Sequence, residues 1–311
     1  MNTAIRSSSA YTRAFLLLGL VMLLWAGNSI VGRAVRADIP PFTLAFGRWL
    51  IAVAVLAPFA WPRLRAQWSE VRGGWGWLLV LGLLGVVCFN SFVYSGLHYT
   101  TAANALLLQA SIPALVLAFD VLLFRGRPAR LQVIGVVCST LGVAFIVFRG
   151  AWQAVMALQI GGVGDALILC GSLSWSLYTV LLRKKPPVDP AVFLLLTFGL
   201  GALALAPMAL WEHAQGLGVH WSGTVLGAFV YVGVFPSVLA YFIYIAATFQ
   251  LGPARAGQAI TLMPLFGALL SALLLGERLA AYHAMGMALI LAGIVLSALA
   301  LRGRRPPTPA A

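Results

Sequence analysis

Long apolar segments, separated by short polar stretches that often contain Gly or Pro, run along the whole chain. A helix needs roughly 20 apolar residues to cross a bilayer, and in hydrocarbon every backbone polar group must be satisfied internally. The pattern therefore predicts ten transmembrane helices. They cover about residues 13–34, 42–60, 75–97, 101–124, 130–148, 162–183, 190–211, 223–246, 253–275 and 281–301.

The segments outside these ten ranges are short. The longest connection, residues 149–161, carries apolar residues that suit a position on the membrane surface. The tail at 302–311 is rich in Pro, and we expect it to be disordered. The first apolar segment is longer than a signal peptide requires and no clear cleavage site follows it, so we interpret it as the first span.

An internal repeat divides the chain into two halves, residues 1–148 and 162–301, at an offset of 150 or 151 residues. The matched residues are Trp25 and Trp175, Arg33 and Arg183, Phe92 and Phe242, Tyr94 and Tyr244, Pro113 and Pro264, Gly135 and Gly286, and Gly142 and Gly293. Each half holds five predicted helices, an odd number, so the second half must enter the membrane in the opposite orientation. The predicted fold is an all-α membrane protein of two inverted five-helix repeats, an arrangement typical of transporters.

Basic residues indicate the orientation. With the N-terminus placed in the cytoplasm, fifteen Lys and Arg lie on the inside and four on the outside. This bias predicts that both termini are cytoplasmic and that the protein is a multi-pass protein of the cell (inner) membrane. The net charge of +13 therefore reflects topology, and we expect no binding to nucleic acid.

Composition excludes other classes of protein. The chain is 62% hydrophobic and 9% charged, and its mean hydropathy is +0.98, which a soluble domain of this size would not show. The three cysteines and four histidines lack metal-ligand spacing. We therefore expect no metal, no cofactor and no enzymatic activity.

Paired prolines predict the position of a binding site. Pro113 and Pro264 fall near the middle of the fourth and ninth spans, where proline interrupts a helix and frees the carbonyls of Gln109 and Ile260. Interrupted helices at matching positions of two halves point to a transport site, although a purely structural kink would give the same pattern.

Polar and aromatic residues within the spans supply candidates for that site. They suit a cavity for a small amphipathic ligand, although small polar side chains also serve as hydrogen-bonding partners between helices. Ser237, Tyr241, Tyr244 and Thr248 share one helical face by their spacing. The predicted substrate-binding residues are Trp25, Asn28, Asn90, Tyr94, Gln109, Pro113, Trp175, Tyr178, Tyr241, Tyr244, Gln258, Thr261 and Pro264.

Few charged residues lie in the spans. Arg48 either extends to the interface or faces the mouth of the cavity. Asp120 is expected to pair with Arg125 or Arg127 near the cytoplasmic end of its helix, and Asp165 to open the sixth span. Glycines seven residues apart in the fifth and tenth spans, such as Gly135 and Gly142, predict close helix contacts there.

Three segments form an ordered set of motifs: Leu24–Ser29, Phe46–Trp49, and Leu275–Leu279 followed by the paired glycines. By these motifs the chain resembles, over about residues 13–301, the EamA-type repeats of the drug/metabolite transporter superfamily. It implies ten helices in inverted halves, with a central cavity lined mainly by spans one, three, four, six, eight and nine. Within the superfamily, we expect the resemblance to point to YddG-type exporters of aromatic amino acids and paraquat.

Together these features predict a secondary transporter that exports amino acids or similar small amphipathic metabolites by alternating access. One alternative is an exporter of drugs or cations such as paraquat, for which only aromatic residues are available at mid-depth. Another is a structural or signalling membrane protein that moves no solute. The expected partners are a small-molecule substrate and the lipid bilayer. The oligomeric state is left open, and a monomer is compatible with the sequence.

Overall fold

The computed structural model describes residues 2–97, 99–100, 102–151, 153, 156, 162–275 and 279–300, and of residues 2–10, 33, 102–104, 271 and 275 only the backbone. The tail at 302–311 and most of the connecting segment at 149–161 lie outside the described residues. Over the described residues the chain is helical and contains no strand.

The first half contains five spanning segments, two of which consist of several pieces. Its helices are α1 (Asn2–Ala34), α2 (Pro41–Ala66), α3 (Trp68–Gly73), α4 (Trp75–Gly82), the π-helix η1 (Leu83–Cys88), α5 (Phe89–Leu97), α6 (Ala102–Gln109), α7 (Ile112–Phe124) and α8 (Arg130–Val147). Helix α1 begins earlier than expected, and α2 continues past its predicted end because the helix accommodates Pro58 and Pro62.

The second half repeats this order. Its helices are α10 (Val163–Leu181), the short 3₁₀ turn η2 (Leu182–Lys184), α11 (Pro190–Ala214), α12 (Gly223–Gly233), the π-helix η3 (Val234–Leu239), α13 (Ala240–Leu251), α14 (Pro253–Ala259), α15 (Leu262–Leu275) and α16 (Ala281–Leu299). In the part of the chain that the structure describes, ten segments are long and apolar enough to cross a membrane. The predicted number of spans is confirmed.

The fourth and ninth spans are interrupted, as the paired prolines predict. Helix α6 ends at Gln109 before α7 begins, and α14 ends at Ala259 before α15 begins. Each proline lies in the first turn of the second piece, where its missing N–H is tolerated. One detail of the prediction is wrong: the carbonyl of Ile260 is not free, because a tight turn brings the amide of Met263 to 3.0 Å from it.

Two π-helical turns, which the sequence pattern did not reveal, lie in the third and eighth spans. They are η1 and η3, and their bounds differ by 151 residues, the offset of the repeat. In η3, Pro236 has no N–H, so the carbonyl of Val232 loses its usual helical donor. The hydroxyl of Ser237 donates to that carbonyl at 2.7 Å. Turns of this kind are frequent at functional sites.

The centre of the bundle is formed by contacts between the halves. Helix α1 packs against α13 and α15, while α10 packs against α5 and α7. Helices α2 and α11 also pack together. There the buried carboxylate of Glu212 accepts the backbone amides of Phe42 at 2.9 Å and Thr43 at 2.7 Å, and so caps the start of α2.

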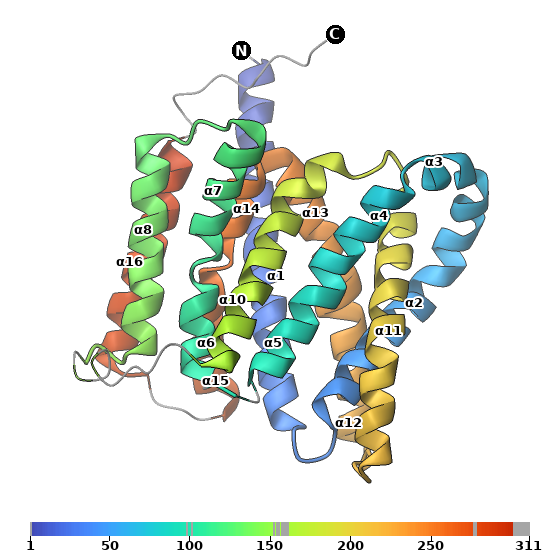
Figure 1. Cartoon of the computed structure of the whole chain (residues 1–311). Helices are drawn as coiled ribbons and strands as arrows, with labels where there is room; N and C mark the ends of the chain where they lie inside the picture. The colour runs from blue at the N-terminus through green and yellow to red at the C-terminus, as the bar shows by residue number, and fades with distance from the viewer. Residues whose placement is uncertain are drawn as a thin grey trace.

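Helices α8 and α16 lie side by side at one edge of the bundle (Figure 1). They run antiparallel, because Gly135 faces Gly293 while Gly142 faces Gly286. The hydroxyl of Ser139 donates to the carbonyl of Ile290 at 3.2 Å between them. The predicted packing role of these glycines is confirmed.

The contact between α8 and α16 gives a testable prediction. A Cβ atom at position 142 would lie 2.7 Å from the carbonyl oxygen of Gly286. We expect Gly142→Ala to lower the melting temperature of the purified protein, since overpacking of this kind typically costs about 1–3 kcal/mol. The matched control is Gly19→Ala, where no atom lies within 4 Å and where the helix should tolerate alanine. Equal melting temperatures for the two variants would contradict the close contact.

Candidate functional site

A cluster of aromatic side chains occupies the contact between the two halves. The ring of Trp25 in α1 lies 5.2 Å from that of Trp175 in α10 and 5.3 Å from that of Tyr244 in α13. Tyr178 lies 5.2 Å from Trp175, and Tyr241 lies 5.9 Å from Trp25. All five side chains are buried. The structure therefore brings together five of the predicted site residues, and we call this set the aromatic cluster.

Two hydrogen bonds connect the aromatic cluster to the π-helical turns. The indole N–H of Trp25 donates to the carbonyl of Pro236 in η3 at 2.9 Å. The hydroxyl of Tyr241 donates to the carbonyl of Gly85 in η1 at 3.2 Å. Gly85 and Pro236 are 151 residues apart, so equivalent carbonyls of the two halves each accept a bond from an aromatic side chain. The cluster is thus attached to an irregular turn in each half.

One hydroxyl of the cluster is hydrogen-bonded locally, whereas the indole nitrogen of Trp175 is buried and has no hydrogen-bond partner among the described residues. The hydroxyls of Tyr244 and Thr179 lie 2.9 Å apart and share a hydrogen bond. The side chain of Asn90, in α5, is buried and donates to the carbonyl of Val86 in η1 at 2.6 Å. Tyr94 is partly buried, and its ring lies 6.4 Å from that of Phe42. Asn90 and Tyr94 therefore lie on α5, the helix that directly follows η1.

The predicted residues of the interrupted spans lie apart from the aromatic cluster's hydrogen bonds. The side chain of Gln258 donates to the carbonyl of Gly293 at 3.1 Å, which directs it toward α16. Thr261 donates to the carbonyl of Gln258 at 2.8 Å, and Gln109 to that of Ala105 at 3.3 Å, both within their own segments. Pro113 is buried and Pro264 is partly buried, each in the first turn of the second piece of its span. Asn28, in the uninterrupted helix α1, is partly buried.

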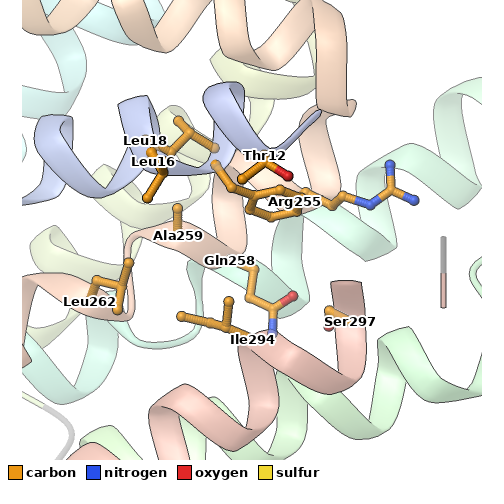
Figure 2. Close-up of a pocket in the computed structure, with 10 residues that line it drawn as sticks. Thr12, Leu16, Leu18, Arg255, Gln258, Ala259, Leu262, Ile294 and Ser297 are labelled. Carbon is orange, nitrogen blue, oxygen red and sulfur yellow. The ribbon is translucent and has the colours of Figure 1, made fainter. Parts of the chain in front are cut away.

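A separate pocket of about 180 Å³ lies between α1, α14, α15 and α16 (Figure 2). Its lining is mostly apolar, and Leu16 on α1 is 70% exposed, so the pocket faces the side of the bundle. Gln258 lines it with its amide turned toward the helix of Ile294, and Arg255 lies at another edge. The pocket is therefore distinct from the contact between the two central tryptophans.

Arg48 faces the interior, which is one of the two orientations that the sequence left open. It is 7% exposed. Its Nε donates to the hydroxyl of Ser237 at 2.6 Å, and its Nη2 donates to the carbonyl of Pro236 at 3.3 Å. The guanidinium carbon lies 4.4 Å from the ring centre of Trp49. Because Trp25 also donates to the carbonyl of Pro236, Arg48 adjoins the aromatic cluster.

The two aspartates lie at helix ends. Asp165 is in the first turn of α10, as expected, and accepts the hydroxyl of Thr100 at 2.5 Å. For Asp120 the ion pair seen is with Arg183 at 2.5 Å, and not the predicted pair with Arg125 or Arg127. The reason is that α10 packs against α7 and brings Arg183 to it from the other half.

Several residues of the site were missed by the sequence analysis. Trp49 packs on Phe198 at 4.7 Å between ring centres, and Phe198 lies 5.2 Å from Tyr241. Phe89 lies 4.9 Å from Trp175. Signals were available for two of them. Trp49 directly follows the in-span Arg48 and ends the segment Phe46–Trp49 that carries the family resemblance, and Phe89 directly precedes the predicted site residue Asn90. Phe198 follows Thr197 in an otherwise apolar run.

Comparison with known proteins identifies the chain's family. A family model, that of the EamA-like transporter family, matches residues 12–148 and again residues 162–299. The chain belongs to the EamA-like transporter family. The two matches fall on the two halves described above, and the ten apolar segments make this EamA-like chain a multi-pass membrane protein.

Individual relatives agree with this assignment. An uncharacterized transporter of Archaeoglobus fulgidus is 30% identical over 288 residues, which cover 92% of this chain and 97% of that protein. The uncharacterized transporter YyaM of Bacillus subtilis is 24% identical over 266 residues, covering 84% and 86%. A solved crystal structure, 23% identical, has a TM-score of 0.72 over 94% of this chain and 99% of that chain, and so shares the fold. This EamA-like chain is a membrane transporter.

Proposed function

We propose that this transporter exports amino acids or similar small amphipathic metabolites across the inner membrane by alternating access. The observation that carries the proposal is the aromatic cluster, because it joins the two halves where α1 and α10 meet the π-helical turns. Aromatic walls with a few oriented polar groups suit a small ligand with an apolar side chain and charged ends. The resemblance to YddG-type exporters favours aromatic amino acids within this class.

Alternating access would use the opposed orientation of the two halves. The antiparallel pairing of α8 with α16, the matching π-helical turns and the two family matches all support an inverted repeat. With Trp25 and Trp175 in contact, the centre is closed around the site. Substrate would enter when the halves tilt and these rings separate on one side.

A cation exporter is a weaker alternative. The aromatic cluster could hold a cation over its rings. However, Arg48 donates to the same carbonyl as Trp25, so a positive charge already adjoins the cluster. A dication in the cluster would meet repulsion in a low-dielectric setting.

The transport proposal predicts a specific loss of activity. In liposomes containing only this protein, we expect saturable uptake of labelled phenylalanine. Trp175→Ala should reduce it by about tenfold or more, because it removes ring contacts with several members of the cluster. The control is Trp61→Ala, since Trp61 is 52% exposed and lies outside the cluster. Normal uptake by a correctly folded Trp175→Ala variant would contradict the placement of the site.

The positions of the carboxylates predict transport without proton coupling. A proton-coupled carrier usually needs an ionisable group that both sides reach in turn, whereas Asp120 is held by Arg183 at one end of the bundle. We expect counterflow of phenylalanine at equal pH on both sides, with ionophores present, to persist in Asp120→Asn. Uptake that requires an imposed proton gradient, and that Asp120→Asn abolishes, would make Asp120 the coupling residue instead.

The charge bias predicts the sidedness of the loops. In a background that lacks the three cysteines, single cysteines at positions 65 and 127 should react with an impermeant thiol reagent only from the cytoplasm. A cysteine at position 216, in the turn after α11, should react from outside. Labelling of positions 127 and 216 from the same side would contradict the inverted scheme.

A further inference from the structure

Arg48 is a buried cation whose acceptors are both neutral. In the described part of the chain, Asp189 forms an ion pair with Arg63, and Asp120 forms one with Arg183. The partners of Arg48 are a hydroxyl and a backbone carbonyl. Burial of a charge inside a membrane protein is costly without an opposite charge, and such residues usually have a function. A neutral side chain could have donated hydrogen bonds to these two neutral acceptors, so they do not account for the charge of Arg48.

Around Arg48 there are more N–H donors than the hydrogen bonds of the structure use. A guanidinium carries five N–H groups, and the bonds to Ser237 and Pro236 use two of them. The neighbouring indole nitrogen of Trp49 is fully buried and, among the described residues, has no hydrogen-bond partner. Buried donors are almost always paired in folded proteins. The excess of donors therefore indicates a ligand that carries acceptors.

The position of Arg48 relates it to the proposed substrate site. It lies seven residues into α2, or about 10 Å along the helix axis. It shares the Pro236 carbonyl with Trp25, and the ring of Trp49 lies 5.8 Å from that of Tyr241. At offsets of 150 to 152 the second half has Phe198, Gly199 and Leu200, none of them charged. The repeat architecture itself therefore does not require an arginine here.

We propose that Arg48 binds the carboxylate of the transported substrate while the aromatic cluster holds its side chain. This inference rests on the proposed function and narrows it to small carboxylates, among them amino acids with apolar or aromatic side chains. A carboxylate supplies the missing negative charge and can accept two parallel N–H bonds from a guanidinium. The indole N–H of Trp49 is a further donor beside it. Substrates that are only cationic would be excluded.

The test compares an amino acid with the same molecule lacking the carboxylate charge. Binding of phenylalanine and of phenylalaninamide is measured on the purified protein. The wild type should bind the acid at least about tenfold more tightly than the amide, the range expected for bonds to a charged group. Arg48→Gln should lose that preference by weakening acid binding only. Arg48→Lys should keep a preference for the acid, because the charge remains.

The matched control is Arg63→Gln, the same substitution on the same helix at a half-exposed residue, which should behave as wild type. An equal loss of acid and amide binding in a folded Arg48→Gln would overturn the inference in favour of a structural role. Should that variant not fold, equal binding of acid and amide by the wild type or by Arg48→Lys would overturn it as well. Wild-type transport of phenylalanine without any acid preference would refute the carboxylate role alone, whereas absence of transport would refute the proposed function too.

Discussion

The carbonyl oxygen of Pro236 accepts hydrogen bonds from Trp25 at 2.9 Å and from Arg48 at 3.3 Å, and the centre of the bundle is arranged around it. In hydrocarbon a backbone carbonyl that leaves the helical ladder must find another donor. The π-helical turn η3 makes such a carbonyl available, and α1 and α2 supply the donors. The equivalent carbonyl of Gly85 receives the hydroxyl of Tyr241 from the opposite half. The hydrogen bonds that satisfy these two backbone carbonyls are therefore also the bonds that assemble the site.

The hydrogen bonds to Pro236 and Gly85 bear on the proposed movement of the transporter between its two access states. Side chains that close the centre are bonded to irregular turns, so the proposed tilt of one half would have to break or exchange those bonds. The peripheral pair α8 and α16 has a different character, since glycines bring the two backbones into close contact. We expect that pair to stay together as a hinge or frame while the bonds at η1 and η3 change. Transporters of inverted repeats move largely by rigid-body rocking around a fixed site.

Much of the fold could be predicted because its signals are local. Apolar runs of sufficient length indicated ten spans, Pro113 and Pro264 marked the two interruptions, and the glycine spacing indicated the contact of α8 with α16. The π-helical turns were not predictable, since η1 contains no proline and an apolar run looks alike in α- and π-helical form. Asp120 was paired with its sequence neighbours, whereas its observed partner Arg183 comes from a distant segment.

The site was only partly predictable for a similar reason. Trp25, Trp175, Tyr241 and Tyr244 stood out because they repeat or share a helix face. By contrast, Gln258 has no matching residue at the repeat offset, and its partner Gly293 lies 35 residues further along the chain, in α16. Arg48 could have faced either way, because a long side chain near a helix end can reach water or the interior. Only the packing of α2 against η3 decides between the two.

The central claim is that substrate binds where the rings of the two halves now touch. The most direct test is an experimental structure of the protein with a transported amino acid bound. The account predicts ligand density between Trp25 and Trp175, with their ring centres farther apart than the present 5.2 Å and the carboxylate facing Arg48. Density elsewhere, for example in the lateral pocket beside Arg255, with the two tryptophans still in contact, would contradict it.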